Sequence, residues 1–504
     1  MKLIIKNLGP IKNNNQAIDL SKDFFVFVGR NNSGKSYVAQ LLWAIFNEDI
    51  IHKFARTNVE IIDNKIVENI NNVAVTPELI GEILDKYSLF LQEETKRETF
   101  NIGKNSQVLN NIVIRFEYEK SELSELREKE IGGIVKIKDN EGNTLEYIEF
   151  KKDQGDLIYK FIERQLPESM KEIIPKKYLD RDLLDKKKFF LIATIIRTML
   201  KHYHETFFLA ASRIFFSTFY RYIYEVDRKR REQDIKKLVD LLENPRKKGN
   251  IQLSDLEELD FKRKYEELDF KRKYTEPMNQ VFEKLFSLEE NIEGHYINLV
   301  KELQQILGGE IKVIRPEGIG VAELYFKIDS VDEPLPMYLA SSSVNQLTTL
   351  YLYLKYWALE KNNFLMIDEP EVNLHPENQI KLINILIQFI QNETGNKVLI
   401  TTHSSMLANA INNYIYLDVL KREKGFNVKK IIEENKLKYV DSSISISQDK
   451  VGVYFFTGDK IIDYERSDDG IYFRNFREVE NNLDNSLRIL TDYIYLQEDE
   501  VEDE

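Results

Sequence analysis

Residues 24–36 read FFVFVGRNNSGKS, and this stretch decides the fold. The apolar run predicts a buried strand that ends in a glycine-led loop. Gly29 to Ser36 match the pattern GxxxxGK[S/T], in which glycines let backbone N–H groups turn toward phosphate oxygens. The apolar residues that follow recur at the spacing of one helix face. The order of strand, phosphate-binding loop and helix predicts an α/β fold with a nucleotide site.

The loop predicts ATP and Mg²⁺ as ligands. Lys35 is expected to reach the β and γ phosphate oxygens, and the Ser36 hydroxyl is expected to bind the metal. The residues predicted to contact the nucleotide from this segment are Gly29, Arg30, Asn31, Asn32, Ser33, Gly34, Lys35, Ser36 and Tyr37.

Composition narrows the possible functions. The chain has 504 residues and a net charge of −13, which argues against general adhesion to nucleic acid because that affinity comes from Lys and Arg. There is no cysteine, which excludes disulfides and cysteine-based zinc sites. The apolar run 189–200 is too short to span a bilayer and contains Arg197. With no signal-peptide pattern, we expect a soluble, cytoplasmic protein without a membrane partner.

Several further strands are predicted around the loop. Alternation and turn residues indicate strands at KLIIKN near the N-terminus, at IVIRFEYE (112–119), on both sides of KDNEGNT (138–144), at FFLAASR (207–213) and at IKVIRP and AELYFKI (311–327). The last hundred residues are predicted to alternate short strands with a final helix, and QEDEVEDE is predicted to be a frayed acidic tail.

The stretch 214–305 is predicted to be mostly helical. It contains EELDFKRKY at 257–265 and again at 266–274. A period of nine is two and a half helical turns, so the two copies would point to opposite sides of a straight helix. This favours a neutral duplication in a solvated helical arm over a shared binding face.

FLMIDEPE supplies the acidic residues that the phosphate loop needs. A buried strand is predicted to end at Asp368, which would hold Mg²⁺ through water, while Glu369 would polarise the attacking water. In ITTHSS (400–405) a further strand is predicted to end at His403. His403 either contacts the γ-phosphate or is a polar residue whose hydrogen bonds are made within the protein. His375, before Pro376, is either a helix cap or part of a dimer-contact loop.

LASSSVNQLTTL (339–350) predicts a helix that begins at its serines. Val344, Leu347 and Leu350 lie along one face of this helix, so the serines stand at its N-terminus. Hydroxyl groups and the helix dipole favour an anion at that position.

The order of phosphate loop, long insertion, serine-rich helix start, IDEPExxLHP and TTHS resembles the ATPase heads of the ABC superfamily. It looks similar in particular to the OLD-like and SMC-like prokaryotic AAA-labelled ATPases, many of which serve in anti-phage defence. The resemblance implies a P-loop NTPase of ABC-ATPase type with an antiparallel β subdomain and a helical insertion. Members of the OLD family proper have a Toprim nuclease after the ATPase, and its acidic pattern is not found after His403.

The resemblance also implies roles for three further residues. ASSSV (340–344) stands where the family has its LSGGQ-like signature, so Ser341 matches the serine that binds the γ-phosphate of the opposite subunit. Ser343 replaces a glycine there, and its side chain would crowd that phosphate. Arg213 stands near the position of the Q-loop glutamine and is expected to take its place at the nucleotide.

Four parts are predicted along the chain: 1–213 and 306–440 as the two parts of the ATPase head, 214–305 as a helical insertion, and 441–504 as strands, a helix and the acidic tail. The expected function is an ATPase that assembles around ATP as a homodimer or higher homo-oligomer. It would regulate a separate effector, a nuclease or toxin, in prokaryotic anti-phage defence.

Two other functions are considered, a DNA-engaging ATPase and a transporter subunit. The basic run Arg228 to Arg231 is either a solvated helical face or a DNA contact of a repair or chromosome-maintenance ATPase. A transporter subunit is disfavoured by the large central insertion.

Overall fold

The structure of the protein is a computed structural model. It describes residues 1–62, 72–102, 109, 111–119, 122, 131–138, 144–153, 158–164, 176–201, 205–225, 228, 274–289, 294–316, 321–393, 395–423, 426–464, 466–467, 470–471 and 473–502.

A mainly parallel six-stranded sheet forms the centre of the molecule, in the order β16-β15-β3-β14-β13-β9. Its strands are β3 (Phe24–Gly29), β9 (Glu205–Leu209), β13 (Asn363–Asp368), β14 (Lys397–Thr402), β15 (Val451–Phe456) and β16 (Ile461–Asp463). Only β16 runs antiparallel to its neighbour. Every residue of β3, β13 and β14 is buried, as expected for strands covered on both faces. The sheet therefore brings the carboxyl ends of β3, β13 and β14 to one edge.

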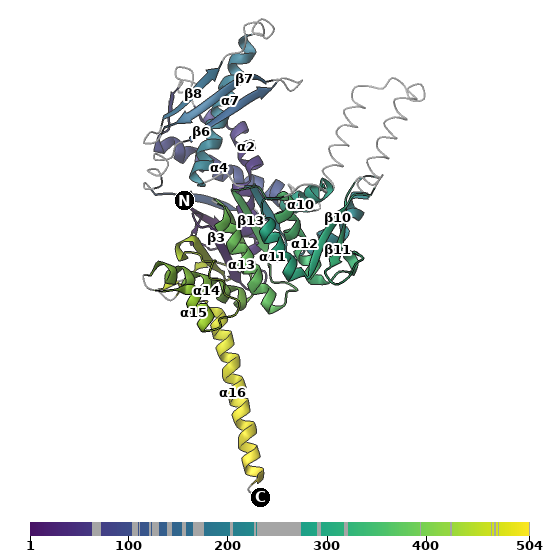
Figure 1. Ribbon diagram of the computed structural model, residues 1–504. Helices are drawn as coiled ribbons and strands as arrows, with labels where there is room; N and C mark the ends of the chain where they lie inside the picture. Colours follow the sequence, from purple (N-terminus) through teal and green to yellow (C-terminus); the bar gives the residue numbers. More distant parts are fainter. Residues whose placement is uncertain are drawn as a thin grey trace, which may run out of the picture.

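Helices pack around this sheet (Figure 1). Those nearest to it are α1 (Lys35–Phe46), α10 (Glu276–Phe286), α11 (Ile297–Leu307), α12 (Ser342–Leu352), the π-helix η5 (Tyr353–Trp357) and α13 (Pro376–Asn392). α10 packs against β9, and α11 packs against α12 and α13. α10 lies within the predicted insertion (214–305) and α11 lies across its end, yet both contact the central body. The four-part division of the chain stays a prediction.

Smaller antiparallel sheets surround the centre. Their strands are β1 (Lys2–Lys6), β2 (Ile18–Asp19), β4 (Asn72–Ala74), β5 (Val113–Glu117), β6 (Ile131–Lys138), β7 (Thr144–Lys152), β8 (Ile158–Arg164), β10 (Gly309–Ile314), β11 (Glu323–Ile328), β12 (Leu335–Pro336), β17 (Arg466–Ser467) and β18 (Gly470–Ile471). Figure 1 shows β6, β7 and β8 beside α7 at the top of the molecule. The N-terminal helices are α2 (Glu48–Thr57), η1 (Val59–Ile61), α4 (Pro77–Glu94), η2 (Thr95–Thr99) and α7 (Lys176–Met199).

Three α-helices and a short 3-10 helix occupy the C-terminal part: α14 (Ser405–Arg422), α15 (Val428–Glu434), η6 (Gln448–Lys450) and α16 (Arg474–Glu502). α14 and α15 were not predicted. The prediction of a frayed acidic tail was wrong for 497–502, because these residues continue α16. Figure 1 shows α16 projecting away from the rest of the molecule.

The strands predicted from the sequence are otherwise confirmed, with one correction. FFLAASR does not form a strand throughout, because β9 ends at Leu209 and residues 211–213 form a turn that directs Arg213 inward. The tandem repeat at 257–274 lies outside the described residues except for Tyr274. Lys229, Arg230 and Arg231 of the basic run also lie outside them.

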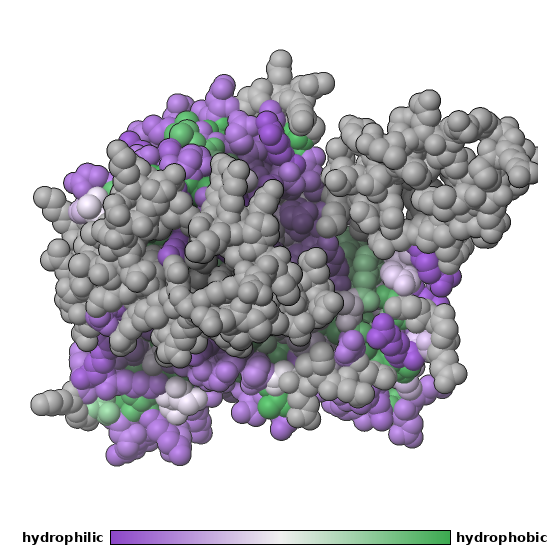
Figure 2. Space-filling view, turned by 90° about the horizontal axis from the view of Figure 1, so that it is seen from above, coloured by the Kyte–Doolittle hydropathy of each residue, from purple (hydrophilic) through white to green (hydrophobic). Residues whose placement is uncertain are grey.

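The hydropathy of one face of the molecule can be followed in Figure 2. Seen from above, the described surface is mostly hydrophilic with smaller hydrophobic patches (Figure 2). Among the described residues, no helix is both long and apolar enough to cross a membrane.

Candidate active site

The phosphate loop connects β3 to α1 and depends on two glycines. Gly29 has φ 155°, and a Cβ there would lie 2.4 Å from the Phe456 carbonyl oxygen. Gly34 has φ 101°, and its Cβ would lie 2.9 Å from Ile11 Cδ1. Any side chain at either position would therefore clash and be conformationally strained. Gly34 is also the N-cap of α1 and provides no side-chain cap, which leaves N–H groups of the first turn available to an anion.

Lys35 lies at the centre of the site. Its Nζ donates to the carbonyl oxygens of Gly29 at 3.1 Å and Arg30 at 3.0 Å, and lies 3.0 Å from His403 Nε2. A charged Lys35 can only donate, so Nε2 of His403 is the acceptor in this contact. Burial lowers the pKa of Lys35, and the three carboxylates of the neighbouring acidic motif oppose that effect. An ammonium group held this way is placed to exchange carbonyl partners for phosphate oxygens.

Ser36 and Asp368 meet although 331 residues separate them in the chain. The Ser36 hydroxyl donates to Asp368 Oδ1 at 3.0 Å, and the Thr401 hydroxyl donates to the same oxygen. Hydroxyl and carboxylate oxygens are the ligands that Mg²⁺ prefers. The pair therefore fits the metal site predicted from the sequence.

Glu369 is held in a strained backbone conformation beside this pair. Its φ is 48°, in the left-handed region, which costs a non-glycine residue about 1–3 kcal/mol. The Glu369 N–H donates to both the carbonyl and the hydroxyl oxygen of Thr401, at 3.1 Å each. The Glu369 carboxylate is one-third exposed and lies 3.4 Å from His403 Nε2. The end of β14 thus places a water-accessible carboxylate next to the Lys35–His403 pair.

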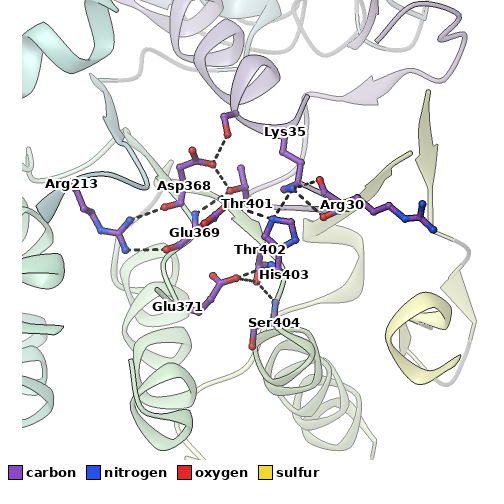
Figure 3. Close-up of polar contacts among 12 residues, drawn as sticks. Arg30, Lys35, Arg213, Asp368, Glu369, Glu371, Thr401, Thr402, His403 and Ser404 are labelled. Atoms are coloured by element: carbon purple, nitrogen blue, oxygen red, sulfur yellow. Dashed lines mark hydrogen bonds and ion pairs between the residues drawn. The ribbon is translucent and has the colours of Figure 1, made fainter. Parts of the chain in front are cut away.

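Arg213 has a different place from the one predicted for it. Its side chain is only 1% exposed, and it donates to five backbone carbonyl groups: those of Ala210, Gln346, Asp368, Glu369 and Pro370. Burial lowers the pKa of Arg213 to about 10, so the guanidinium is still charged at neutral pH. Figure 3 shows it reaching the backbone of Asp368 and Glu369 from the side opposite Lys35. We interpret Arg213 as a residue that positions the acidic motif, in place of the predicted nucleotide contact.

Glu371 is a residue that the sequence analysis missed. Its Oε1 accepts hydrogen bonds from the Thr402 hydroxyl and the His403 N–H, at 2.7 Å each. Burial raises the pKa of Glu371, and these two hydrogen bonds only partly offset the rise. Ser404 is fixed by its own hydrogen bond to Gln379 at 2.7 Å. Glu371 therefore orients the turn that presents His403, and its place in IDEPE was the signal that could have identified it.

Several other loop residues predicted to bind nucleotide are exposed to solvent. Arg30, Asn31 and Asn32 are exposed, and Figure 3 shows the Arg30 side chain pointing away from the other labelled residues. The Tyr37 ring packs against Phe100, with 5.4 Å between ring centroids.

The hydroxyl of Ser33 provides a further test of the fit to a phosphate. It is buried and has no hydrogen-bond partner within the described residues. An unpaired buried hydroxyl in a phosphate loop is consistent with a ligand that supplies the partner.

Ser341 caps the start of α12. The Ser341 hydroxyl accepts from the Val344 N–H at 3.3 Å and lies 2.9 Å from the Ser343 hydroxyl. Ser341 is exposed and Ser343 is partly exposed. The predicted helix start is confirmed, and the predicted contact with a second subunit's nucleotide stays a prediction.

His375 also caps a helix. It is the N-cap of α13, and its Nδ1 accepts from the Glu377 N–H at 3.4 Å. The geometry therefore supports the first of its two predicted roles.

The family follows from a comparison with known protein families. The model described as AAA ATPase domain matches residues 1–408, which include the phosphate loop, the acidic motif and His403. The chain belongs to this family. Its fold is a P-loop ATPase fold of AAA/ABC type, with a parallel central sheet and additional antiparallel strands.

Solved structures of SMC heads are among the matches. The Smc head of Pyrococcus furiosus, bound to the C-terminal domain of ScpA, aligns with 14% identity and a TM-score of 0.32, over 97% of this chain and 98% of that chain. The SMC head of Thermotoga maritima aligns with 10% identity and a TM-score of 0.28, over 92% and 98%. No curated protein matches the chain at a significant level.

Arg213→Met tests the role of the buried guanidinium. Five carbonyl oxygens lose their donor, so we expect the free energy of unfolding to fall by about 3 kcal/mol in denaturant titrations. The control is Arg221→Met, since the half-exposed Arg221 pairs with Glu225 and Glu323 and should contribute less than about 1 kcal/mol. Equal losses in the two variants would contradict the anchoring role.

Glu371→Gln tests the effect of burial on a carboxyl group. The pKa of Glu371 is higher in the folded chain than in the unfolded chain. The unfolded chain therefore loses the Glu371 proton at a lower pH than the folded chain does. The contribution of Glu371 to stability is full below the unfolded pKa and is lost as pH rises through the folded pKa. We expect wild type to lose stability relative to the variant across the pH range just above the ordinary glutamate pKa, as measured by urea unfolding at several pH values.

The control for this pH dependence is Glu377→Gln. Lys381 lowers the pKa of the exposed Glu377, so any effect of that substitution on pH dependence has the opposite sign. A pH-independent difference between wild type and Glu371→Gln would show that Glu371 does not titrate in this range.

Proposed function

We propose that the chain hydrolyses ATP with Mg²⁺ at this site. The observation that supports the proposal most directly is the 3.0 Å contact between the Ser36 hydroxyl and Asp368, which joins two distant motifs. Beside it lie a lysine for the phosphates and a partly exposed carboxylate for water. A bound Mg²⁺ would neutralise charge that develops on the phosphate oxygens.

Each residue has a separate task in this proposal. The loop N–H groups and Lys35 bind and orient the phosphates, while Ser36 and Asp368 hold the metal. Glu369 accepts a proton from the attacking water, and its position relative to β14 is fixed by Thr401. His403 contacts the γ-phosphate, and this contact replaces its present contact with Lys35 when the phosphate is bound.

Glu369→Gln and Lys35→Ala separate catalysis from binding. Glu369→Gln keeps the shape of the site but removes the base, so we expect kcat to fall on the order of 10²–10³-fold with ATP still bound. Lys35→Ala is expected to weaken ATP binding itself. Phosphate release and equilibrium binding of a fluorescent ATP analogue measure the two effects.

Glu377→Gln is the matched control because Glu377 is an exposed glutamate on α13. Normal turnover in Glu369→Gln would remove the assigned base. Unchanged affinity in Lys35→Ala would place the phosphates elsewhere.

We further propose that copies of the chain assemble around ATP through the start of α12. Ser341 is exposed there, and two large apolar residues beside it, Tyr338 and Leu339, are 75% and 61% exposed. An exposed apolar pair next to a helix N-terminus suits a second copy that brings a phosphate-bearing site.

Ser341→Arg tests this assembly. In a Glu369→Gln background, light scattering is expected to show a rise in mass when ATP and Mg²⁺ are added, and the arginine is expected to abolish it by occupying the space of the phosphate. Ser330→Arg, at an exposed position outside α12, is the control and should associate normally. If Ser341→Arg still associates with ATP, these serines only cap the helix.

The biological setting is the part of the proposal that rests on motif resemblance. The assembled ATPase would act in the cytoplasm as a sensor that regulates a separate nuclease or toxin in anti-phage defence. Affinity capture from the native host with the Glu369→Gln variant tests this, because a trapped ATP state should retain the effector. Recovery of duplex DNA in place of a protein would favour the DNA-engaging alternative.

A further inference from the structure

α16 leaves the head at an anchored base. Phe473, just before the helix, is 2% exposed, and its ring lies 6.3 Å from the partly buried ring of Phe476. The next described residues of the helix are almost all exposed up to Tyr493. A helix of 29 residues is about 44 Å long, so most of α16 extends beyond the head (Figure 1).

The exposed part of α16 has an apolar face. Val479, Leu483, Leu487 and Leu490 are 59%, 65%, 67% and 64% exposed. Intervals of four, four and three residues place them along one side of the helix. Most helical stability in proteins comes from packing such a face, because isolated helices are marginal in water. The pattern therefore calls for a surface that covers it.

Charge indicates the chemistry of that surface. Residues 474–504 contain ten acidic and three basic residues, a net charge of −7 out of −13 for the whole chain. Six of the acidic residues lie in 498–504, which has no basic residue. The helix dipole places partial negative charge at the C-terminal end of a helix, so carboxylates there destabilise the helix unless cations lie near them. The surface that covers the end of α16 should be basic.

Such a surface exists on the head near the base of α16. Residues 421–438 contain seven basic and three acidic residues, a net charge of +4. We call the exposed basic and apolar residues of this segment the basic end of the head: Lys421, Arg422, Phe426, Lys429, Lys430, Lys436, Leu437 and Lys438. Arg422, Lys429 and Lys430 pair with Asp418, Glu433 and Glu434, and these exposed ion pairs contribute little, so the cations can take a second carboxylate partner.

The position of the basic end follows from its contacts. It lies at the end of α14 and on α15, and these two helices pack together. α14 is fixed beside the start of α16, because Asn412 exchanges hydrogen bonds with the backbone of Ile471 at 2.8 and 3.0 Å. Phe426 and Leu437 add apolar area, since they are 52% and 46% exposed.

We propose that α16 pairs antiparallel with α16 of a second copy of this chain. The two apolar faces cover each other, and the acidic end of each helix (498–502) lies against the basic end of the partner's head. This is a two-fold arrangement in which both copies make the same contacts. A parallel pair would instead place the two acidic tips side by side. The pairing needs no nucleotide, so it is independent of the proposed ATPase activity.

The first test compares the mass of nucleotide-free full-length variants by light scattering. Wild type is expected to form a dimer, and Leu483→Glu with Leu487→Glu is expected to raise the dissociation constant at least about 100-fold. The matched control is Asn481→Glu with Asn485→Glu, which adds the same charge on the other side of α16. Lys429→Glu with Lys430→Glu should weaken the dimer, and added salt should weaken the wild-type dimer.

The second test determines orientation and uses the absence of cysteine from the chain. Val479→Cys and Tyr493→Cys are prepared separately, one with a mass tag, and oxidised as a mixture. An antiparallel pair yields a disulfide between the two variants, whereas a parallel pair yields disulfides within each variant.

Three results would overturn the inference: a monomeric wild type at micromolar concentration, a dimer unaffected by the Leu483 and Leu487 substitutions, or disulfides only within each variant. Lys35→Ala separates this inference from the proposed function. That variant is expected to dimerise through α16 although it binds ATP weakly, and loss of the dimer in it would refute a nucleotide-independent contact.

Discussion

The arrangement of the site depends on the buried guanidinium of Arg213. Its hydrogen bonds join the end of β9, the middle of α12 and the end of β13, three segments far apart in the chain. A charge removed from water is tolerated only when its donors are satisfied, and here backbone carbonyl groups satisfy them. The same bonds hold the carbonyl groups on both sides of the strained Glu369 backbone. Together with the Thr401 contacts of the Glu369 N–H, this anchor fixes the backbone that carries the carboxylate next to His403.

A second constraint comes from β14, which lies between the strand of the phosphate loop and the strand of the acidic motif. Thr401 bonds to Asp368 and Glu369, and His403, just beyond the strand, contacts Lys35. The last residues of one strand thus touch both halves of the site. Lys35 already donates to two loop carbonyl groups, so a bound phosphate would replace existing hydrogen bonds of its ammonium group. The free energy of binding gained from this exchange is smaller than the gain from hydrogen bonds to an unpartnered ammonium group.

Much of the site was predictable because its residues follow buried strands at fixed spacings. Parallel strands align their carboxyl ends, which explains why Lys35, Asp368 and His403 meet as expected. The position of Arg213 was not predictable, because local sequence does not show whether a side chain after a strand turns toward the ligand or into the core. Glu371 lies in the same acidic motif, but its role in orienting the turn depends on tertiary hydrogen bonds from Thr402 and His403, which the motif alone does not show. α14 escaped detection because three asparagines interrupt its apolar pattern, and one of them, Asn412, is fixed only by tertiary contacts.

The strand order also affects how the chain folds during synthesis. Both neighbours of β3 in the sheet, β14 and β15, lie after residue 396. Ribosomes add about 5–20 residues per second, so β3 emerges roughly 20–70 seconds before its first partner strand. Throughout this interval a fully apolar strand has unpaired N–H and C=O groups and no sheet to join. The nascent chain therefore presents an aggregation-prone segment until its partner strands are made, and its yield in cells should depend on chaperones that bind this segment.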